Sequence, residues 1–128
     1  MCDVYTLPDF TVRVRRSLRR KLRFILENGG KCCYCDRSLH EDLDTVLLAS
    51  VDHLVPLAAG KPNHARGPNV KLSCMACNLL KSSASAYSID HARRIIQQRR
   101  TLCKFWLAIV TAEQQCLLPA PVSREAER

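Results

Sequence analysis

The sequence is poor in aromatic residues and has no long apolar run. Aromatic side chains make up 5% of the 128 residues, with one tryptophan, three tyrosines and three phenylalanines. So few rings disfavour a protein that binds single strands by stacking bases on an aromatic platform. No stretch approaches the roughly 18 consecutive apolar residues that a membrane-spanning helix needs, so we expect no membrane partner.

The N-terminal residues also lack the pattern of a secretory signal peptide. The first ten, MCDVYTLPDF, have no basic start followed by an apolar stretch. We therefore expect a cytoplasmic or nucleoid-associated protein whose thiols stay reduced. Under such conditions, paired cysteines act more often as metal ligands than as disulfides.

The length suits one small domain, which we place at 1–116 with a flexible tail at 117–128. An apolar residue recurs every three or four positions in 11–28, which predicts a basic helix ended by Gly29-Gly30. The same spacing predicts a long helix at 89–115. Its expected buried stripe consists of Ala92, Ile96, Cys103, Trp106 and Val110.

The segment between these helices has a mixed pattern. Residues 45–56 are rich in β-branched and apolar side chains and predict a strand of a short hairpin, which Pro56 ends. Residues 58–68 contain two glycines and two prolines and predict a loop. Asn69 is a candidate cap for a short helix that runs through Lys81. The expected fold class is therefore a small α+β domain.

Four of the eight cysteines form two chelating pairs, Cys32-x2-Cys35 and Cys74-x2-Cys77, separated by 38 residues. A two-residue gap lets both sulfurs of one turn reach the same ion, and two such turns complete a tetrahedron. Four sulfurs leave no open coordination position, so this spacing predicts a structural zinc. Disulfides, a redox CxxC or plain burial are the alternatives, and Cys33 competes with Cys32 as a ligand.

A group of polar residues lies between the cysteine pairs and directly after the second pair. Asp52-His53-x2-Pro56 is followed by Asn69, and Asn78 comes directly after Cys77 with Lys81 three residues later. With the cysteines, this order resembles the HNH endonuclease family, also called ββα-metal nucleases. The resemblance covers about residues 19–82. It implies a ββα-metal, treble-clef-like core with a basic N-terminal helix and a long C-terminal helix.

The resemblance also implies roles for the polar residues. His53 would be the general base that activates water for phosphodiester hydrolysis, since histidine can accept a proton near neutral pH. Asp52 and Asn78 would hold a catalytic divalent metal, and Asn69 would fix the loop or orient His53. A carboxylate and an amide oxygen form a hard site that suits Mg²⁺ or Mn²⁺.

Two features depart from the simplest form of this pattern. The third letter of the family name is often histidine, and Asn78 stands at that position here. Moreover, neighbours on a regular strand point to opposite faces, so Asp52 and His53 should diverge. Both can serve one site only if the strand ends, twists or bulges there.

The positive charge favours an anionic partner, and nucleic acid and an anionic membrane both qualify on charge alone. The chain has 20 basic and 12 acidic residues, which gives a net charge of +8. We expect the partner to be double-stranded DNA. Its phosphates would be contacted by one set of basic residues: Arg16, Arg19, Arg20, Arg23, Lys81, Arg93 and Arg94. A solvated basic helix is the alternative for the N-terminal arginines. A homodimer or a guiding partner protein is also compatible with such a nuclease.

Three other functions fit parts of the sequence. A non-catalytic zinc-stabilised module that binds nucleic acid explains the cysteines and the charge, although it leaves the spacing of Asp52, His53 and Asn78 unexplained. A protein-interaction domain could use Trp106 and its apolar neighbours on the 89–115 helix as an anchor. A thiol oxidoreductase would need an exposed, reactive Cys32-x2-Cys35 pair.

Overall fold

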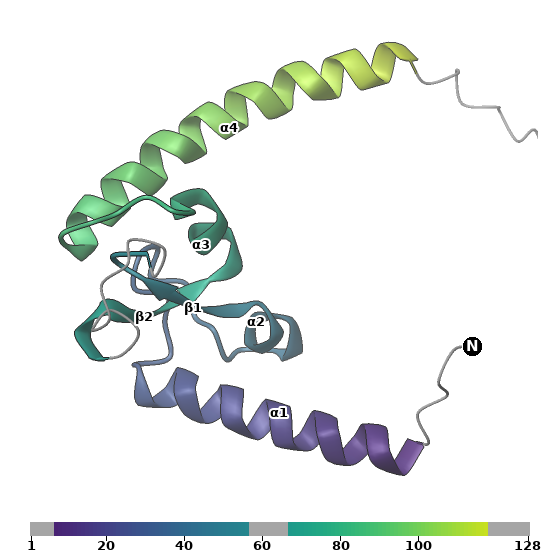
Figure 1. Cartoon of the computed structure of the whole chain (residues 1–128). Helices are drawn as coiled ribbons and strands as arrows, with labels where there is room; N and C mark the ends of the chain where they lie inside the picture. The colour runs from purple at the N-terminus through teal and green to yellow at the C-terminus, as the bar shows by residue number, and fades with distance from the viewer. Residues whose placement is uncertain (1–6, 57–66, 118–128) are drawn as a thin grey trace, which may run out of the picture.

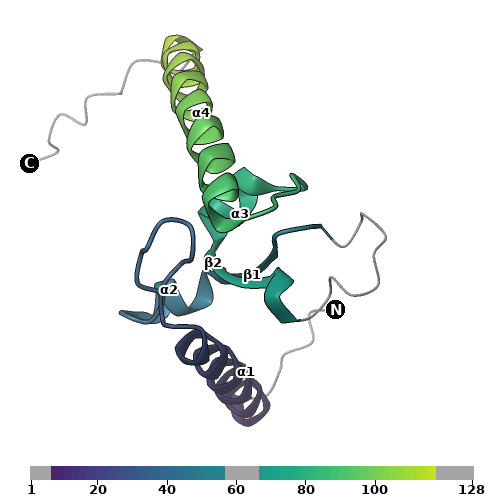
Figure 2. The same ribbon diagram turned by 90° about the vertical axis from the view of Figure 1, so that its left-hand side faces the viewer.

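The computed structural model describes residues 7–56 and 67–117, with only the backbone of residues 7–10. It is a small α+β fold with one two-stranded antiparallel sheet, flanked by helices, and a cluster of cysteines. Helix α1 (Leu7–Glu27) lies on one side of the sheet, and helices α3 (Met75–Lys81) and α4 (Ile89–Leu117) lie on the other (Figure 1). A view turned by 90° shows the same order of layers (Figure 2).

Helix α1 begins four residues earlier than the apolar spacing predicts. Pro8 lies in its first turn, where a proline is tolerated because the first helical N–H groups have no partner within the helix. The helix ends at Gly29 and Gly30, whose φ angles are +88° and +72°. A Cβ atom at Gly30 would lie 2.7 Å from the His40 ring, so the exposed His40 side chain would have to move, and the positive φ itself favours glycine there.

The predicted strand over 45–56 is wrong at its N-terminal end. Asp42 caps a short helix, α2 (Leu43–Leu47), because its carboxylate accepts the Thr45 N–H at 2.8 Å. Strand β1 (Ala49–His53) follows directly. The interaction of Asp42 with Thr45 is the local signal that favours a helical turn here.

The helix predicted from Asn69 onward is also wrong in its first part. Gly67–Asn69 form a single 3-10 turn, η3, and Val70–Cys74 form strand β2. This strand pairs with β1 in a register that places His53 opposite Val70 and Ala49 opposite Cys74. Pairing with β1 therefore overrides the cap at Asn69, and α3 begins only at Met75. Most of the loop predicted at 58–68 lies outside the described residues, as does all but the first residue of the predicted tail.

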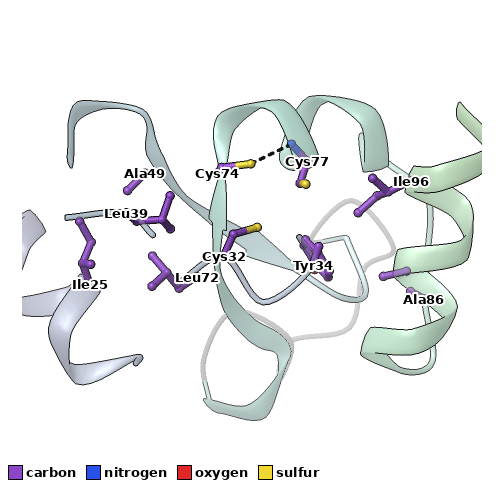
Figure 3. Packing of buried hydrophobic residues seen from close by; sticks show 11 residues of the cluster. Ile25, Cys32, Tyr34, Leu39, Ala49, Leu72, Cys74, Cys77, Ala86 and Ile96 are labelled. Atoms are coloured by element: carbon purple, nitrogen blue, oxygen red, sulfur yellow. Dashed lines mark hydrogen bonds between the residues drawn. The ribbon is translucent and has the colours of Figure 1, made fainter. Parts of the chain in front are cut away.

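The core is a continuous cluster that extends from α1 through the sheet and cysteines to α4. Ile25, Leu39 and Leu72 lie on the α1 side, and Ile96 lies on the α4 side (Figure 3). The prediction of a buried stripe on α4 is correct for Ala92 and Ile96. The prediction is wrong for the other three residues of the stripe, which are exposed: Cys103, Trp106 and Val110.

Helix α4 leaves the folded body after its first turns, so its distal residues have nothing in the described chain to pack against (Figure 1). None of the helices in the described parts of the chain combines the length and apolar character needed to cross a bilayer.

Candidate metal centre and polar site

The two cysteine pairs come together at the centre of the fold. The Sγ atoms of Cys32, Cys35, Cys74 and Cys77 all lie within 4.8 Å of one another. The Sγ atoms of Cys35 and Cys74 are 3.8 Å apart, which is close to the separation of about 3.8 Å expected for two sulfurs bound tetrahedrally at 2.3 Å from zinc. Four cysteines placed this way could hold a structural metal such as zinc.

Each half of the cluster is built by a short local motif. In the first pair, the turn is closed by the Asp36 N–H, which donates to the Cys32 carbonyl at 3.0 Å, and Asp36 adopts a positive φ of 59°. In the second pair, Cys74 is the N-cap of α3, and the Cys77 N–H donates to its Sγ at 3.4 Å (Figure 3). The helix start therefore fixes both sulfurs of that pair.

Cys33 lies outside the cluster although it is next to Cys32. It is half-buried, and its N–H donates to the Leu72 carbonyl, which ties the turn to β2. Burial, and then the nearby charge of Cys32, raise the pKa of the Cys33 thiol to about 12. The thiol therefore stays protonated, and Cys32 is the ligand that the two-residue spacing predicts.

The cluster sulfurs share hydrogen bonds among themselves. Hydrogen bonds with Cys74 and then Cys77 lower the pKa of Cys32, whereas hydrogen bonds with Cys32 and then Cys74 raise the pKa of Cys77. One thiolate is thus stabilised by neighbouring thiols, which a bound metal would replace as the charge-compensating group. The Arg100 guanidinium donates to Cys77 Sγ at 3.6 Å and adds positive charge beside the cluster.

Asp52 forms a buried ion pair rather than an open carboxylate. Its side chain accepts a hydrogen bond from the Tyr34 hydroxyl at 2.5 Å, and the Lys81 ammonium lies 3.2 Å from its Oδ2 and 3.4 Å from its Oδ1. Lys81 is completely buried and also donates to the His53 carbonyl at 2.6 Å. Burial and the adjacent Asp52 raise the pKa of Tyr34, which keeps its proton available for this bond.

Asn78 lies against the same face of β1 as Lys81. Its amide donates to the Ser50 hydroxyl at 2.6 Å, and Ser50 is two residues before Asp52 on the strand. Alternation along β1 places Ser50 and Asp52 on the face toward α3. The fold therefore brings Asp52 and Asn78 to a common interface between β1 and α3.

His53 belongs to the other face of β1 by the same alternation. Val51, on that face, lines a surface recess together with Arg20 and Lys21 of α1. His53 is half-buried and is the last residue of the strand. The face of β1 that includes His53 is therefore the one toward the basic helix, whereas Asp52 and Asn78 lie on the opposite face.

Asn69 holds the chain directly after the strand that carries His53. Its side-chain oxygen accepts the Val55 N–H at 2.8 Å, and its amide donates to the Val55 carbonyl at 2.9 Å. In addition, its own carbonyl accepts the Leu54 N–H at 3.0 Å. This pair of side-chain bonds fixes the backbone two residues after His53.

The basic residues expected to contact nucleic acid fall into two groups. Arg16, Arg19, Arg20 and Arg23 are exposed on α1 and line one recess with Val12. In contrast, Arg93 donates to the Cys33 carbonyl at 2.9 Å and pairs with Asp36 at 3.6 Å, and Arg94 donates to the Tyr87 hydroxyl at 3.0 Å. Lys81 is buried. The second group is therefore engaged within the chain.

Tyr34 and Arg99 are two residues of this region that the sequence analysis did not select. Tyr34 lies inside the first cysteine turn and links it to Asp52. Arg99 donates to the carbonyls of Leu80 and Lys81 at the end of α3 and joins that helix to α4. Two signals in the sequence could have pointed to these residues. Tyr34 lies inside a CxxC turn, and Arg99 follows Ile96 by one helical turn.

Comparisons with known proteins identify no relative of this chain. No protein-family model matches the chain, and neither the curated proteins nor the solved structures contain a match to it. The interpretation therefore depends on the residues and their geometry.

Proposed function

We propose that the chain is a nuclease of the HNH type whose ββα-like core is stabilised by zinc at the four cysteines. The observation that supports this most is the combined position of three elements. The turn held by Asn69 follows His53. Asn78 and Asp52 both lie at the interface between β1 and α3. The cysteine cluster fixes the junction of β2 and α3.

In this proposal, His53 is the general base. It removes the proton from the attacking water, for which a half-buried imidazole at a strand end is a suitable group. Asn69 acts on the backbone rather than on the substrate, because its side chain is used in both bonds to Val55. It is therefore a positioning residue for the segment that carries His53.

The proposed phosphate contacts come from α1. Arg20 borders the recess on the His53 side of β1, and Arg16 and Arg19 continue the same basic helix face. Arginine side chains bind phosphate oxygens in a bidentate manner and position a duplex without selecting its sequence. This helix would place the backbone of double-stranded DNA over the strand that ends at His53.

Asp52 and Asn78 are the residues that would hold a divalent metal. Their oxygens suit Mg²⁺ or Mn²⁺, which when bound would stabilise the negative charge that develops on the phosphate. However, the Lys81 ammonium already balances the charge of Asp52. A metal at this position would have to compete with that ammonium, so we expect weak affinity until the phosphate of the substrate adds its own negative charge.

A second candidate function is a zinc-stabilised module that binds nucleic acid without cutting it. One observation favours it: Asp52 is buried in contacts with Tyr34 and Lys81, and strand alternation separates it from His53. In this function the ion pair is purely structural and α1 is the binding surface. The two functions differ in whether His53 matters.

A plasmid-nicking assay tests the proposal. Zinc-loaded protein is incubated with supercoiled plasmid and Mg²⁺ or Mn²⁺, alongside His53→Ala and the matched control His40→Ala, an exposed histidine on a different segment. We expect metal-dependent nicking that falls at least a hundredfold in His53→Ala and persists in His40→Ala. Binding without cutting by all three proteins, at equal zinc content, would support the binding module instead.

A further inference from the structure

Lys81 holds the end of strand β1 through the backbone of His53. Its ammonium donates to the His53 carbonyl at 2.6 Å, and its side chain is completely buried. The following residue is fixed separately, because the Leu54 N–H donates to the Asn69 carbonyl and the Leu54 carbonyl accepts the Ala86 N–H at 2.9 Å. Lys81 is therefore the side chain that holds the backbone at His53 itself.

The position of the Lys81 ammonium is unusual for a buried cation beside a carboxylate. The ammonium lies 3.2 Å and 3.4 Å from the two oxygens of Asp52, but only 2.6 Å from the uncharged carbonyl of His53. Where water is excluded, Coulomb attraction favours the closest contact with the carboxylate, and such charged pairs normally shorten to about 2.7–2.9 Å. Another group must therefore occupy part of the acceptor capacity of Asp52.

The Tyr34 hydroxyl is that group. It donates to Oδ2 of Asp52 at 2.5 Å, and this is the oxygen that lies 3.2 Å from the ammonium. The side chains of Tyr34 and Asp52 are buried, so they must satisfy one another's hydrogen bonds. Tyr34 belongs to the turn between Cys32 and Cys35, which places the hydroxyl on a part of the fold that the cysteine cluster holds in place.

We propose that the Tyr34 hydroxyl positions the backbone of His53 by way of this buried ion pair. By donating to Asp52, it weakens the attraction of the carboxylate for the Lys81 ammonium. The ammonium is then free to hold the His53 carbonyl. The first cysteine turn is thereby joined to the general base, so the inference rests on the proposed function for the role of His53. The contacts themselves can be tested without any catalysis.

A single NMR signal reports the state of the His53 carbonyl. His53-Leu54 is the only histidine–leucine pair in the sequence, so protein labelled with ¹³C at histidine carbonyls and ¹⁵N at leucine gives one carbonyl–amide correlation. Tyr34→Phe removes the hydroxyl and keeps the ring in the core. We expect the ammonium to move toward Asp52, the bond to His53 to lengthen, and the carbonyl signal to shift to lower frequency.

Tyr87→Phe is the matched control. The Tyr87 hydroxyl also accepts a hydrogen bond, from Arg94, but this side chain is exposed, so its change should leave the His53 signal in place. In a Lys81→Met background, Tyr34→Phe should no longer move the signal, because the group that transmits the effect is absent. An unmoved signal in Tyr34→Phe, at the zinc content of the parent protein, would overturn the inference.

Nicking kinetics test what this placement does for His53. Tyr34→Phe should lower kcat about tenfold and leave KM for the plasmid unchanged, because it alters the placement of the base and not the α1 surface. A shifted carbonyl signal with an unchanged kcat would overturn the positioning role. Absence of nicking by the parent protein would instead reject the proposed function, and with it the role of His53 on which this inference rests.

Discussion

Lys81 and Asp52 form an ion pair in which both side chains are buried, with relative exposures of 0% and 6%. Both residues belong to the polar group that the sequence pattern selects, and that pattern predicts a phosphate contact for Lys81 and a metal for Asp52. Sequence spacing alone does not reveal that β1 and α3 press these two side chains together. Once water is excluded, the two charges must compensate each other, and this requirement determines their geometry.

Replacing Lys81 by methionine should therefore destabilise the fold. The change leaves the Asp52 carboxylate buried without a counter-charge, and we expect a loss of about 3 kcal/mol in the free energy of unfolding. Denaturant titration measures it, with the exposed Lys31→Met as the control. If Asp52 can bind a divalent metal, millimolar Mg²⁺ should raise the melting temperature of Lys81→Met more than that of the parent protein. Equal responses would argue against a metal at Asp52.

At the scale of elements, the hairpin depends on Asn69. Its position after a glycine- and proline-rich stretch suggested a helix cap, and the strand from Val70 to Cys74 was missed. Five residues are too few to show a clear alternation, and their strand conformation comes from pairing with β1. The cysteine spacing, in contrast, predicted correctly which four cysteines come together, because the geometry of a two-residue turn is local.

Substitution of Asn69 tests its role at the strand end. Asn69→Ala removes both side-chain bonds to Val55, so we expect a stability loss of about 1–2 kcal/mol and faster hydrogen exchange at the Val55 amide. Asn69→Asp keeps the acceptor for the Val55 N–H but sets a carboxylate oxygen against the Val55 carbonyl, so the loss of stability should persist in this variant. Unchanged exchange in Asn69→Ala would mean that other contacts hold this turn.

For the whole molecule, the cysteine cluster joins the two ends of the core. Cys32 and Cys77 are fully buried, and the apolar residues on either side of them belong to different helices. A fold of this size has a limited apolar core, and a metal would supply the missing stabilisation. The basic and apolar helix patterns predicted α1 and α4, but not that α4 would extend beyond this core.

Removal of the metal should consequently unfold the domain. We expect a chelator to abolish the cooperative thermal transition, followed by circular dichroism, and added Zn²⁺ to restore it. Cys35→Ser should weaken zinc binding less than Cys77→Ser, because Cys35 is exposed and Cys77 lies inside the core. Acid should act in the same direction as the chelator, since protons compete with zinc for the thiolates. A chelated protein that still melts cooperatively at the same temperature would contradict this dependence.

The charge distribution of the whole molecule determines where nucleic acid would bind under the proposed function. The exposed arginines of α1 are available for phosphates, whereas Arg93 and Arg94 are already bound to groups within the chain. The dependence of binding on salt reports the number of phosphates contacted. Changing Arg16, Arg19 and Arg20 together to glutamine should therefore reduce the slope of log K against log salt by about 2 to 3 on a DNA duplex.

The double change Arg93→Gln with Arg94→Gln provides the matched comparison. It removes nearly as much charge, yet it should reduce the slope by less than 1 because these guanidinium groups are held by Cys33, Asp36 and Tyr87. Equal slopes for the two variants would show that net charge, rather than the α1 surface, determines binding. A reduction confined to the α1 variant would place the phosphate backbone along that helix, on the side of the sheet to which alternation assigns His53.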